Sequence, residues 1–134
     1  MTSRKTEIVV YYMCWKKLCA QELKMYYKLL PGFIEVVFHN DDRGMTVIDL
    51  QSTVPDKEHG THLMKHACTA ALSRGITKVR LDDCSDRYRK DHNIYTKVGM
   101  LYETDGGPEM TGNAIDIAAY MTDTEPPQIY ALNL

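Results

Sequence analysis

Apolar and polar residues alternate along the chain with two different spacings, which distinguish strands from helices. Segments rich in β-branched and aromatic residues, such as EIVVYYM at residues 7–13, predict strands. The segment CWKKLCAQELKMYYKLL at residues 14–30 predicts an amphipathic helix, because one stripe is apolar apart from Glu22. The stripe consists of Trp15, Leu18, Cys19, Glu22, Met25, Tyr26 and Leu29. In full, the pattern predicts strands at 7–13, 33–39, 45–54, 76–83, 100–104 and 113–121, and helices at 14–30, 59–74 and 85–98.

Turn-forming residues separate these segments and indicate how they connect. The turn NDDRG at residues 40–44 predicts a hairpin, and DGGPEMTG at 105–112 predicts a second one. Between the hairpins, a strand–helix–strand unit requires parallel pairing. We therefore expect an α/β (α+β mixed) protein with a central mixed sheet of about six strands flanked by helices. We expect one domain, residues 1–134, whose apolar tail at 124–134 packs on the domain or on a second copy.

The composition is that of an ordinary globular protein and mainly excludes classes of partner. The net charge of −2 provides no basic surface for direct contact with nucleic acid. No apolar run approaches the roughly 20 residues that a membrane span needs. The four cysteines contain no C-x-x-C pair, which favours reduced thiols. We expect a cytoplasmic protein, or a nuclear one if a histone is its substrate, and a homodimer through the tail is an open alternative.

The stretch KEHGTHLMKH at residues 57–66 contains the residues that predict a ligand-binding site. It follows a predicted strand and opens a predicted helix, whose first-turn amides have no intrahelical acceptor and carry the positive end of the helix dipole. Such amides bind diphosphates. Gly60 allows close backbone approach, Thr61 adds a hydroxyl, and Lys57 adds a positive charge.

The three histidines of this stretch raise the alternative of a metal site. Zinc needs three convergent ligands, and the H-E-x-x-H pattern is absent. His59 lies at the start of the helix, too early to align with His62 and His66. We therefore expect no metal, and we expect His62 and His66 to lie along one helix face, partly exposed.

Two motifs make the resemblance to a family specific. VPDKEHGTHLMKHACTAALSRGITKVRLDD, followed by NIYTKVGMLYE, resembles the GNAT superfamily of acetyl-CoA-dependent N-acetyltransferases over about residues 33–121. GTHLMKH is especially similar to the histone acetyltransferase branch. The family motif, Gln or Arg, two residues, Gly, one residue, then Gly or Ala, departs here at Pro55 and Glu58, where a glutamate carboxylate would face the phosphates. The strand-borne catalytic glutamate of that branch aligns with Gly44.

The resemblance implies a donor, acetyl-CoA, and a role for individual residues. Tyr95 in YTKVGM matches the family tyrosine that protonates the leaving thiolate, and its structural alternative is a core tyrosine. For the general base that deprotonates the amine we place Asp49 and Asp82 first among the carboxylates at the strand ends, which also include Glu35 and Asp83. The donor-binding positions are Ile48, Leu50, Ser52, Lys57, Glu58, His59, Gly60 and Thr61.

The acceptor is the least specified part of the prediction. Clustered acids in HNDDRG and LDDCSD favour a cation, although turns are rich in aspartate for conformational reasons as well. We expect direct transfer of an acetyl group to a primary amine of a small cationic acceptor such as a polyamine. The alternatives are a lysine of a histone or other protein, and a catalytically degenerate module that only binds acetyl-CoA.

Overall fold

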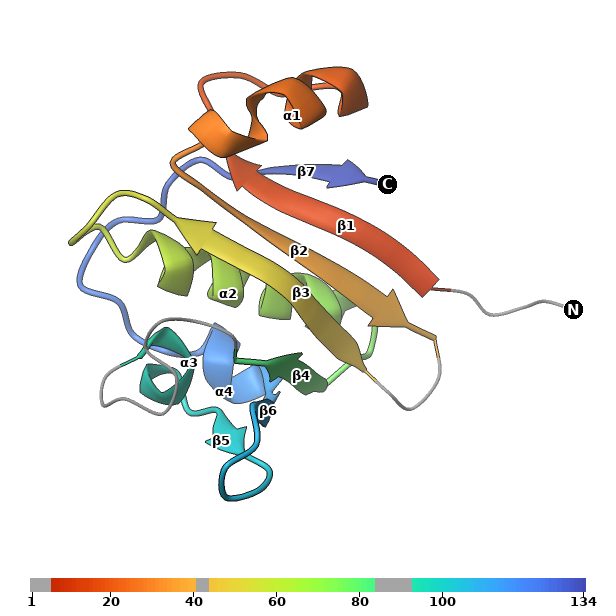
Figure 1. The fold of residues 1–134 in the computed structure, drawn as a ribbon, viewed down its shortest axis with the longest axis vertical. Helices are drawn as coiled ribbons and strands as arrows, with labels where there is room; N and C mark the ends of the chain where they lie inside the picture. Colours follow the sequence, from red (N-terminus) through yellow and green to blue (C-terminus); the bar gives the residue numbers. More distant parts are fainter. Residues whose placement is uncertain (1–5, 41–43, 84–92) are drawn as a thin grey trace, which may run out of the picture.

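The computed structural model describes residues 6–40, 44–83 and 93–134. Strands and helices follow one another along the chain as Figure 1 shows. None of the helices in these ranges combines the length and apolar character needed to cross a bilayer. The elements are β1 (Thr6–Met13), α1 (Ala20–Tyr26), the 3-10 turn η1 (Tyr27–Leu29), β2 (Gly32–His39), β3 (Met45–Ser52), α2 (His59–Ser73), β4 (Lys78–Asp82), α3 (Ile94–Lys97), β5 (Leu101–Tyr102), β6 (Glu109–Asn113), α4 (Ala114–Ala118) and β7 (Tyr130–Asn133).

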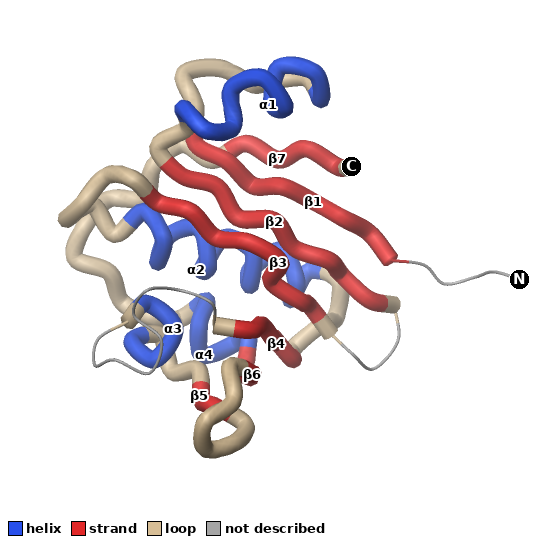
Figure 2. The backbone as a smooth tube through the Cα atoms, in the orientation of Figure 1, coloured by secondary structure: helices blue, strands red, loops and turns tan. Residues whose placement is uncertain are grey.

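The strands form one mixed sheet of seven strands in the order β5-β6-β4-β3-β2-β1-β7. β3 and β4 pair in parallel, and the other neighbours are antiparallel, as the strand–helix–strand unit and the hairpins predict. The strand beyond the expected six is β7, in the tail. It pairs with β1, with Val10 opposite Leu132, and forms one edge of the sheet (Figure 2).

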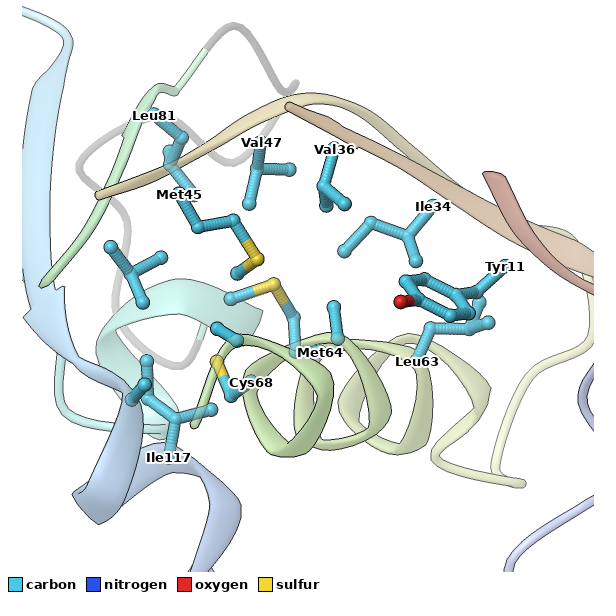
Figure 3. Close-up of a cluster of buried hydrophobic side chains, with 14 of the residues drawn as sticks. Tyr11, Ile34, Val36, Met45, Val47, Leu63, Met64, Cys68, Leu81 and Ile117 are labelled. Carbon is cyan, nitrogen blue, oxygen red and sulfur yellow. The ribbon is translucent and has the colours of Figure 1, made fainter. Parts of the chain in front are cut away.

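The main core lies between the sheet and α2. Figure 3 shows side chains from β1, β2, β3 and β4 pointing toward α2, which contributes Leu63, Met64 and Cys68. Leu63 and Met64 have no exposed surface, and burying a side chain of this size stabilises the fold by about 1.5–3 kcal/mol. This packing holds α2 against β1, β2 and β3, so the start of α2 has a fixed position relative to the end of β3.

The opposite face of the sheet is covered by α1, which is shorter than predicted. The helix begins only at Ala20, because Leu18 is tied to the Tyr12 hydroxyl and Cys19 and Glu22 form a capping box. The predicted apolar stripe is right for Leu18, which is buried, and wrong for Trp15 and Met25, whose exposed fractions are 67% and 70%. The residues that pack there are Leu18, Leu23 and Leu30, with Val10, Tyr12 and Phe33 of the sheet.

The predicted strand at 113–121 is wrong. Residues Ala114–Ala118 form helix α4, and the strand β6 lies earlier, inside the segment predicted as a turn. The Asn113 side chain accepts a hydrogen bond from the Ile115 backbone N–H at 2.8 Å, which caps the helix. Ala114 and Ile117 are fully buried, and their three-residue spacing suits one helix face.

Two other predictions reach beyond the described residues. The hairpin between β2 and β3 is confirmed by their antiparallel pairing, and residues 41–43 of its turn lie outside the described ranges. Of the helix predicted at 85–98, only α3 is described, with Asn93 as its N-cap, and residues 85–92 lie outside the described ranges.

Candidate active site

The site begins where β3 and β4 separate. The two strands pair only over Met45–Val47 and Val79–Leu81, and they diverge toward their carboxyl ends (Figure 1). Beyond Val47, β3 continues to Ser52 with backbone groups on that side that β4 does not pair. A separation of this kind leaves unpaired peptide groups that can bind an extended ligand.

A β-bulge in β3 accompanies the separation. Glu35 of β2 pairs with Asp49, whereas the next residue of β2 pairs with Val47, so Ile48 is an extra residue. Bulges bend a strand and shift its alternation of faces by one position. As a result Asp49 lies on the face away from α2, beside Glu35, although unbroken alternation would put it on the face of Val47.

A cavity of about 670 Å³ lies at this separation. It is lined by β3, β4, β6, α3 and the segment after β5. Five residues predicted for the site line it together: Ile48, Asp49, Leu50, Asp82 and Tyr95. The cavity therefore joins the tyrosine predicted as the acid to both carboxylates predicted first as the base.

Tyr95 reaches the cavity because α3 is fixed at its first turn. The Asn93 side chain accepts a hydrogen bond from the Thr96 N–H at 2.8 Å, and its amide donates to Asp83 at 3.2 Å. Asp83 is 2% exposed and accepts a second hydrogen bond, at 2.6 Å, from the Tyr102 hydroxyl. These bonds tie α3 to the ends of β4 and β5, and they make Asp83 a structural carboxylate rather than a free base.

The remaining base candidate, Glu35, lies outside the cavity that Tyr95 lines. It belongs to a second cavity, of about 430 Å³, beneath α1, together with Leu23 and Phe33. Asp49 and Asp82 are therefore the predicted base candidates that share a cavity with Tyr95. The Asp49 carboxylate accepts a hydrogen bond from the Gln51 amide at 3.0 Å.

The sequence analysis missed three charged residues of this cavity: Arg80, Glu103 and Glu109. Arg80 could have been found, because it alternates with the buried residues of KVRLD and so lies on their opposite face. Its Nε is buried without a hydrogen-bond partner among the described residues. Glu103 and Glu109 reach the cavity only through the β5–β6 register, which turn residues alone do not define.

The start of α2 lies next to this cavity. Its first helical hydrogen bond runs from the His62 N–H to the Glu58 carbonyl at 2.9 Å. Within the described ranges, the N–H groups of His59, Gly60 and Thr61 have no acceptor. Three free amides at the positive end of a 15-residue helix fit a diphosphate.

Gly60 lies where α2 approaches α3. A Cβ atom there would lie 2.6 Å from Ile94 Cδ1, and 3.9 Å from Ser52 Cβ at the end of β3. The donor-binding residues predicted on β3 and those predicted on α2 therefore meet at Gly60. Lys57 is exposed beside this junction.

Glu58 does not present its carboxylate to the free amides. It is the N-cap of α2 in the left-handed region, with φ of 55°, and its side chain accepts hydrogen bonds from the backbone N–H groups of Asp123 and Thr124 at 2.8 and 3.0 Å. Partial desolvation raises the pKa of the Glu58 carboxyl, but hydrogen bonds from Thr124, Asp123 and Lys97 outweigh it and lower the pKa overall. The repulsion of phosphates expected from this residue is thus reduced by its orientation.

The three histidines do not converge. His62 is 4% exposed and hydrogen-bonds the Thr124 hydroxyl at 2.9 Å, so the prediction of a partly exposed side chain is wrong for it. The His66 ring packs edge-on against Tyr11. Partial desolvation lowers the pKa of both His59 and His66. Across 6–40, 44–83 and 93–134, no three acidic, histidine or cysteine side chains gather closely enough to hold a metal ion.

Comparisons with known proteins bear on the fold. No family model matches the chain, and no curated protein matches it in sequence. Among solved structures it is similar to the AtaT toxin bound to the C-terminus of the antitoxin AtaR and to acetyl-CoA, with a TM-score of 0.50 and 12% identity over 79% of this chain and 85% of that one. The chain therefore has a GNAT-type acetyltransferase fold.

Two aminoglycoside acetyltransferases also match. An aminoglycoside 6'-acetyltransferase type Ii has a TM-score of 0.46 and 21% identity, over 63% of this chain and 62% of its own length. The aminoglycoside 6'-N-acetyltransferase from Enterococcus faecium has a TM-score of 0.42 and 19% identity, over 63% and 67%. The chain thus spans less than two thirds of the length of the first of these enzymes.

Proposed function

We propose that this protein is an acetyl-CoA-dependent N-acetyltransferase that acetylates a primary amine of a small cationic acceptor such as a polyamine. One observation carries the proposal: the separation of β3 and β4 brings Tyr95 and two carboxylates into one cavity, beside a helix start with three free amides. The donor supplies an activated acetyl group as a thioester. The free N–H groups of His59, Gly60 and Thr61 are the groups that would hold its diphosphate.

The residues of the cavity have the chemistry that acetyl transfer to an amine needs. An ammonium group has no lone pair, so Asp49 or Asp82 accepts its proton directly or through water. The amine nitrogen then forms a bond to the carbonyl carbon of the acetyl group, and the carbon–sulfur bond breaks. The Tyr95 hydroxyl donates a proton to the departing sulfur, and the second proton that the nitrogen loses returns to the Tyr95 oxygen, so that the products are the amide and the free thiol. Unpaired N–H groups of β3 beyond the bulge are suitable donors for the carbonyl oxygen.

The charge of the cavity favours a cationic acceptor. Four carboxylates line it, from Asp49, Asp82, Glu103 and Glu109, against the single guanidinium of Arg80. Such an excess attracts amines in their protonated form and raises their local concentration. A polyamine carries several positive charges in a small volume, which suits this lining better than a neutral amine does.

The experiment is an acetyl-CoA consumption assay with spermidine, free amino acids, aminoglycosides and histone-tail peptides. We expect turnover with spermidine, and we expect Tyr95→Phe to lower turnover by about 10²-fold or more while acetyl-CoA binding changes little. Tyr27→Phe is the matched control, because Tyr27 lies in η1, away from the cavity. Unchanged turnover in Tyr95→Phe would assign Tyr95 to the core.

Two other functions have a specific observation in their favour. The resemblance of GTHLMKH to histone acetyltransferases favours lysine, and faster turnover of a histone-tail peptide than of spermidine would select it. The departures at Pro55, Glu58 and Gly44 favour a catalytically degenerate module. Binding of acetyl-CoA in isothermal titration calorimetry without turnover of any amine would select that alternative.

A further inference from the structure

A segment distant in sequence passes across the start of α2 and is hydrogen-bonded to it. Residues 120–124, here called the strap, leave α4 and pass the N-terminal end of α2 on the way to β7 (Figure 2). The Thr124 hydroxyl lies 2.9 Å from Glu58 Oε1, 2.9 Å from His62 Nε2 and 3.1 Å from the Lys57 carbonyl oxygen. At the other end of the strap, the Lys65 ammonium donates to the carbonyl of Tyr120.

Glu58 is the centre of this attachment. A single oxygen, Oε1, accepts hydrogen bonds from the Asp123 N–H, the Thr124 N–H and the Thr124 hydroxyl. The other oxygen, Oε2, lies 3.5 Å from the Lys97 ammonium. Hydrogen bonds to an ionised carboxylate are stronger than those between neutral groups, so this side chain is the principal tie between α2 and the strap.

The backbone of the same residue is held in an unfavourable conformation. Glu58 has φ of 55° and Asp56 has φ of 61°, in the left-handed region that side chains other than glycine rarely adopt. Each such residue costs about 1–3 kcal/mol and persists only where its surroundings determine it. The strap provides such surroundings, because Thr124 contacts both the Glu58 side chain and the carbonyl group of Lys57, which precedes it.

The same contacts reach the helix that carries Tyr95. Lys97 belongs to α3, and its ammonium lies both 3.5 Å from Glu58 and 5.9 Å from the centre of the Tyr120 ring. Glu58 therefore joins the start of α2, the strap and α3. These elements hold the two parts of the proposed site, the free amides and the tyrosine.

We infer that Glu58 is a positioning residue, which uses the strap to hold the free amides of α2 in the geometry that binds the donor diphosphate. The inference rests on the proposed function for the identity of the ligand. It assigns to the carboxylate a role that the glycine at this position of the family motif lacks, and it explains how a negative side chain is accommodated beside an anion site.

The test compares three substitutions by titration calorimetry with acetyl-CoA, at a temperature where circular dichroism shows each variant fully folded. Glu58→Ala removes every hydrogen bond between the Glu58 side chain and the strap and should weaken binding by about 10-fold or more. Glu58→Gln keeps an oxygen that accepts the three strap hydrogen bonds, and it should restore affinity to within about 3-fold of the wild type. Glu58→Gly removes the contacts but relieves the left-handed strain, and it should bind as weakly as Glu58→Ala.

Hydrogen exchange measured by mass spectrometry provides a second readout. Glu58→Ala should accelerate exchange in peptides that cover 119–124 and 59–63, and Thr124→Val should accelerate it less, because both backbone donors remain. Wild-type affinity in Glu58→Ala or in Glu58→Gly would overturn the inference while the proposed function stands. Failure of the wild type itself to bind acetyl-CoA would overturn the proposed function, and the positioning role with it.

Discussion

Substitution of Gly44 tests how closely the residue before β3 packs against Lys78. Gly44 has φ of +81°, and a methyl group there would overlap the carbonyl oxygen of Lys78 and lie 3.0 Å from its carbonyl carbon. The left-handed conformation costs an alanine about 1–2 kcal/mol. Overlap with a backbone group, which cannot rotate away, adds about 1–3 kcal/mol. We therefore expect Gly44→Ala to lower the free energy of unfolding by roughly 2–5 kcal/mol in total.

Gly75→Ala is the matched control for this substitution. Gly75 has φ of +76°, and nothing lies within 4 Å of the position that its Cβ would take, so the variant carries the conformational cost alone. Urea denaturation at pH 7 measures both variants. The difference of about 1–3 kcal/mol should separate the midpoints by the order of 1 M urea. Equal midpoints would refute the close approach of Gly44 to Lys78.

The lack of space at Gly44 also limits which residue can act as the general base. Gly44 aligns with the catalytic glutamate of the histone acetyltransferase branch, and the Lys78 carbonyl leaves no room for a side chain at this position. A Gly44→Glu variant would meet the obstacle that Gly44→Ala meets. The base for the proposed reaction must therefore be a residue at another position, and Asp49 and Asp82 are the candidates in the cavity.

Three further predictions concern the donor, pH and thiol reactivity. Gly60→Glu should weaken acetyl-CoA binding by about 10-fold or more in titration calorimetry, because it adds bulk and negative charge at the free amides; unchanged affinity would place the diphosphate elsewhere. Hydrogen bonds from Arg74 at 2.9 and 3.0 Å lower the pKa of the Glu7 carboxyl below its usual 4.5. The stability that this ion pair contributes is therefore present above pH 4.5 and is lost as the pH falls through the lowered pKa. Urea midpoints measured from pH 6 to pH 3 should fall less in Glu7→Gln than in the wild type. Burial raises the pKa of the Cys68 thiol to about 12, so iodoacetamide should label the exposed Cys19 in the native protein and reach Cys68 only after unfolding; equal labelling rates would contradict the packing of Cys68 beneath the sheet.

The fold class could be predicted because its signals are local. The β-branched and aromatic residues of EIVVYYM, the glycine after the second helix and the hairpin turn are each recognised from residues within a few positions. The predictions failed where a contact made only in the folded chain decided the outcome. The helix predicted from Cys14 begins at Ala20 because Tyr12 binds Leu18. Residues Ala114–Ala118 of NAIDIAAYM form a helix because Ala114 packs beneath α2, with its N–H bonded to the Thr77 carbonyl.

The candidate site divides in the same way. The free amides of residues 59–61, the glycine at the helix start and the tyrosine in YTKVGM follow from short motifs. Helix geometry leaves the first N–H groups of a helix without intrahelical acceptors in any context. The face on which Asp49 lies and the turning of Glu58 toward residues 123–124 do not follow from any motif. They depend on one bulge in β3 and on a segment more than 60 residues away in the chain. A bulge reverses every later side chain of its strand, and long-range hydrogen bonds form only when the whole chain is folded, so neither leaves a local pattern.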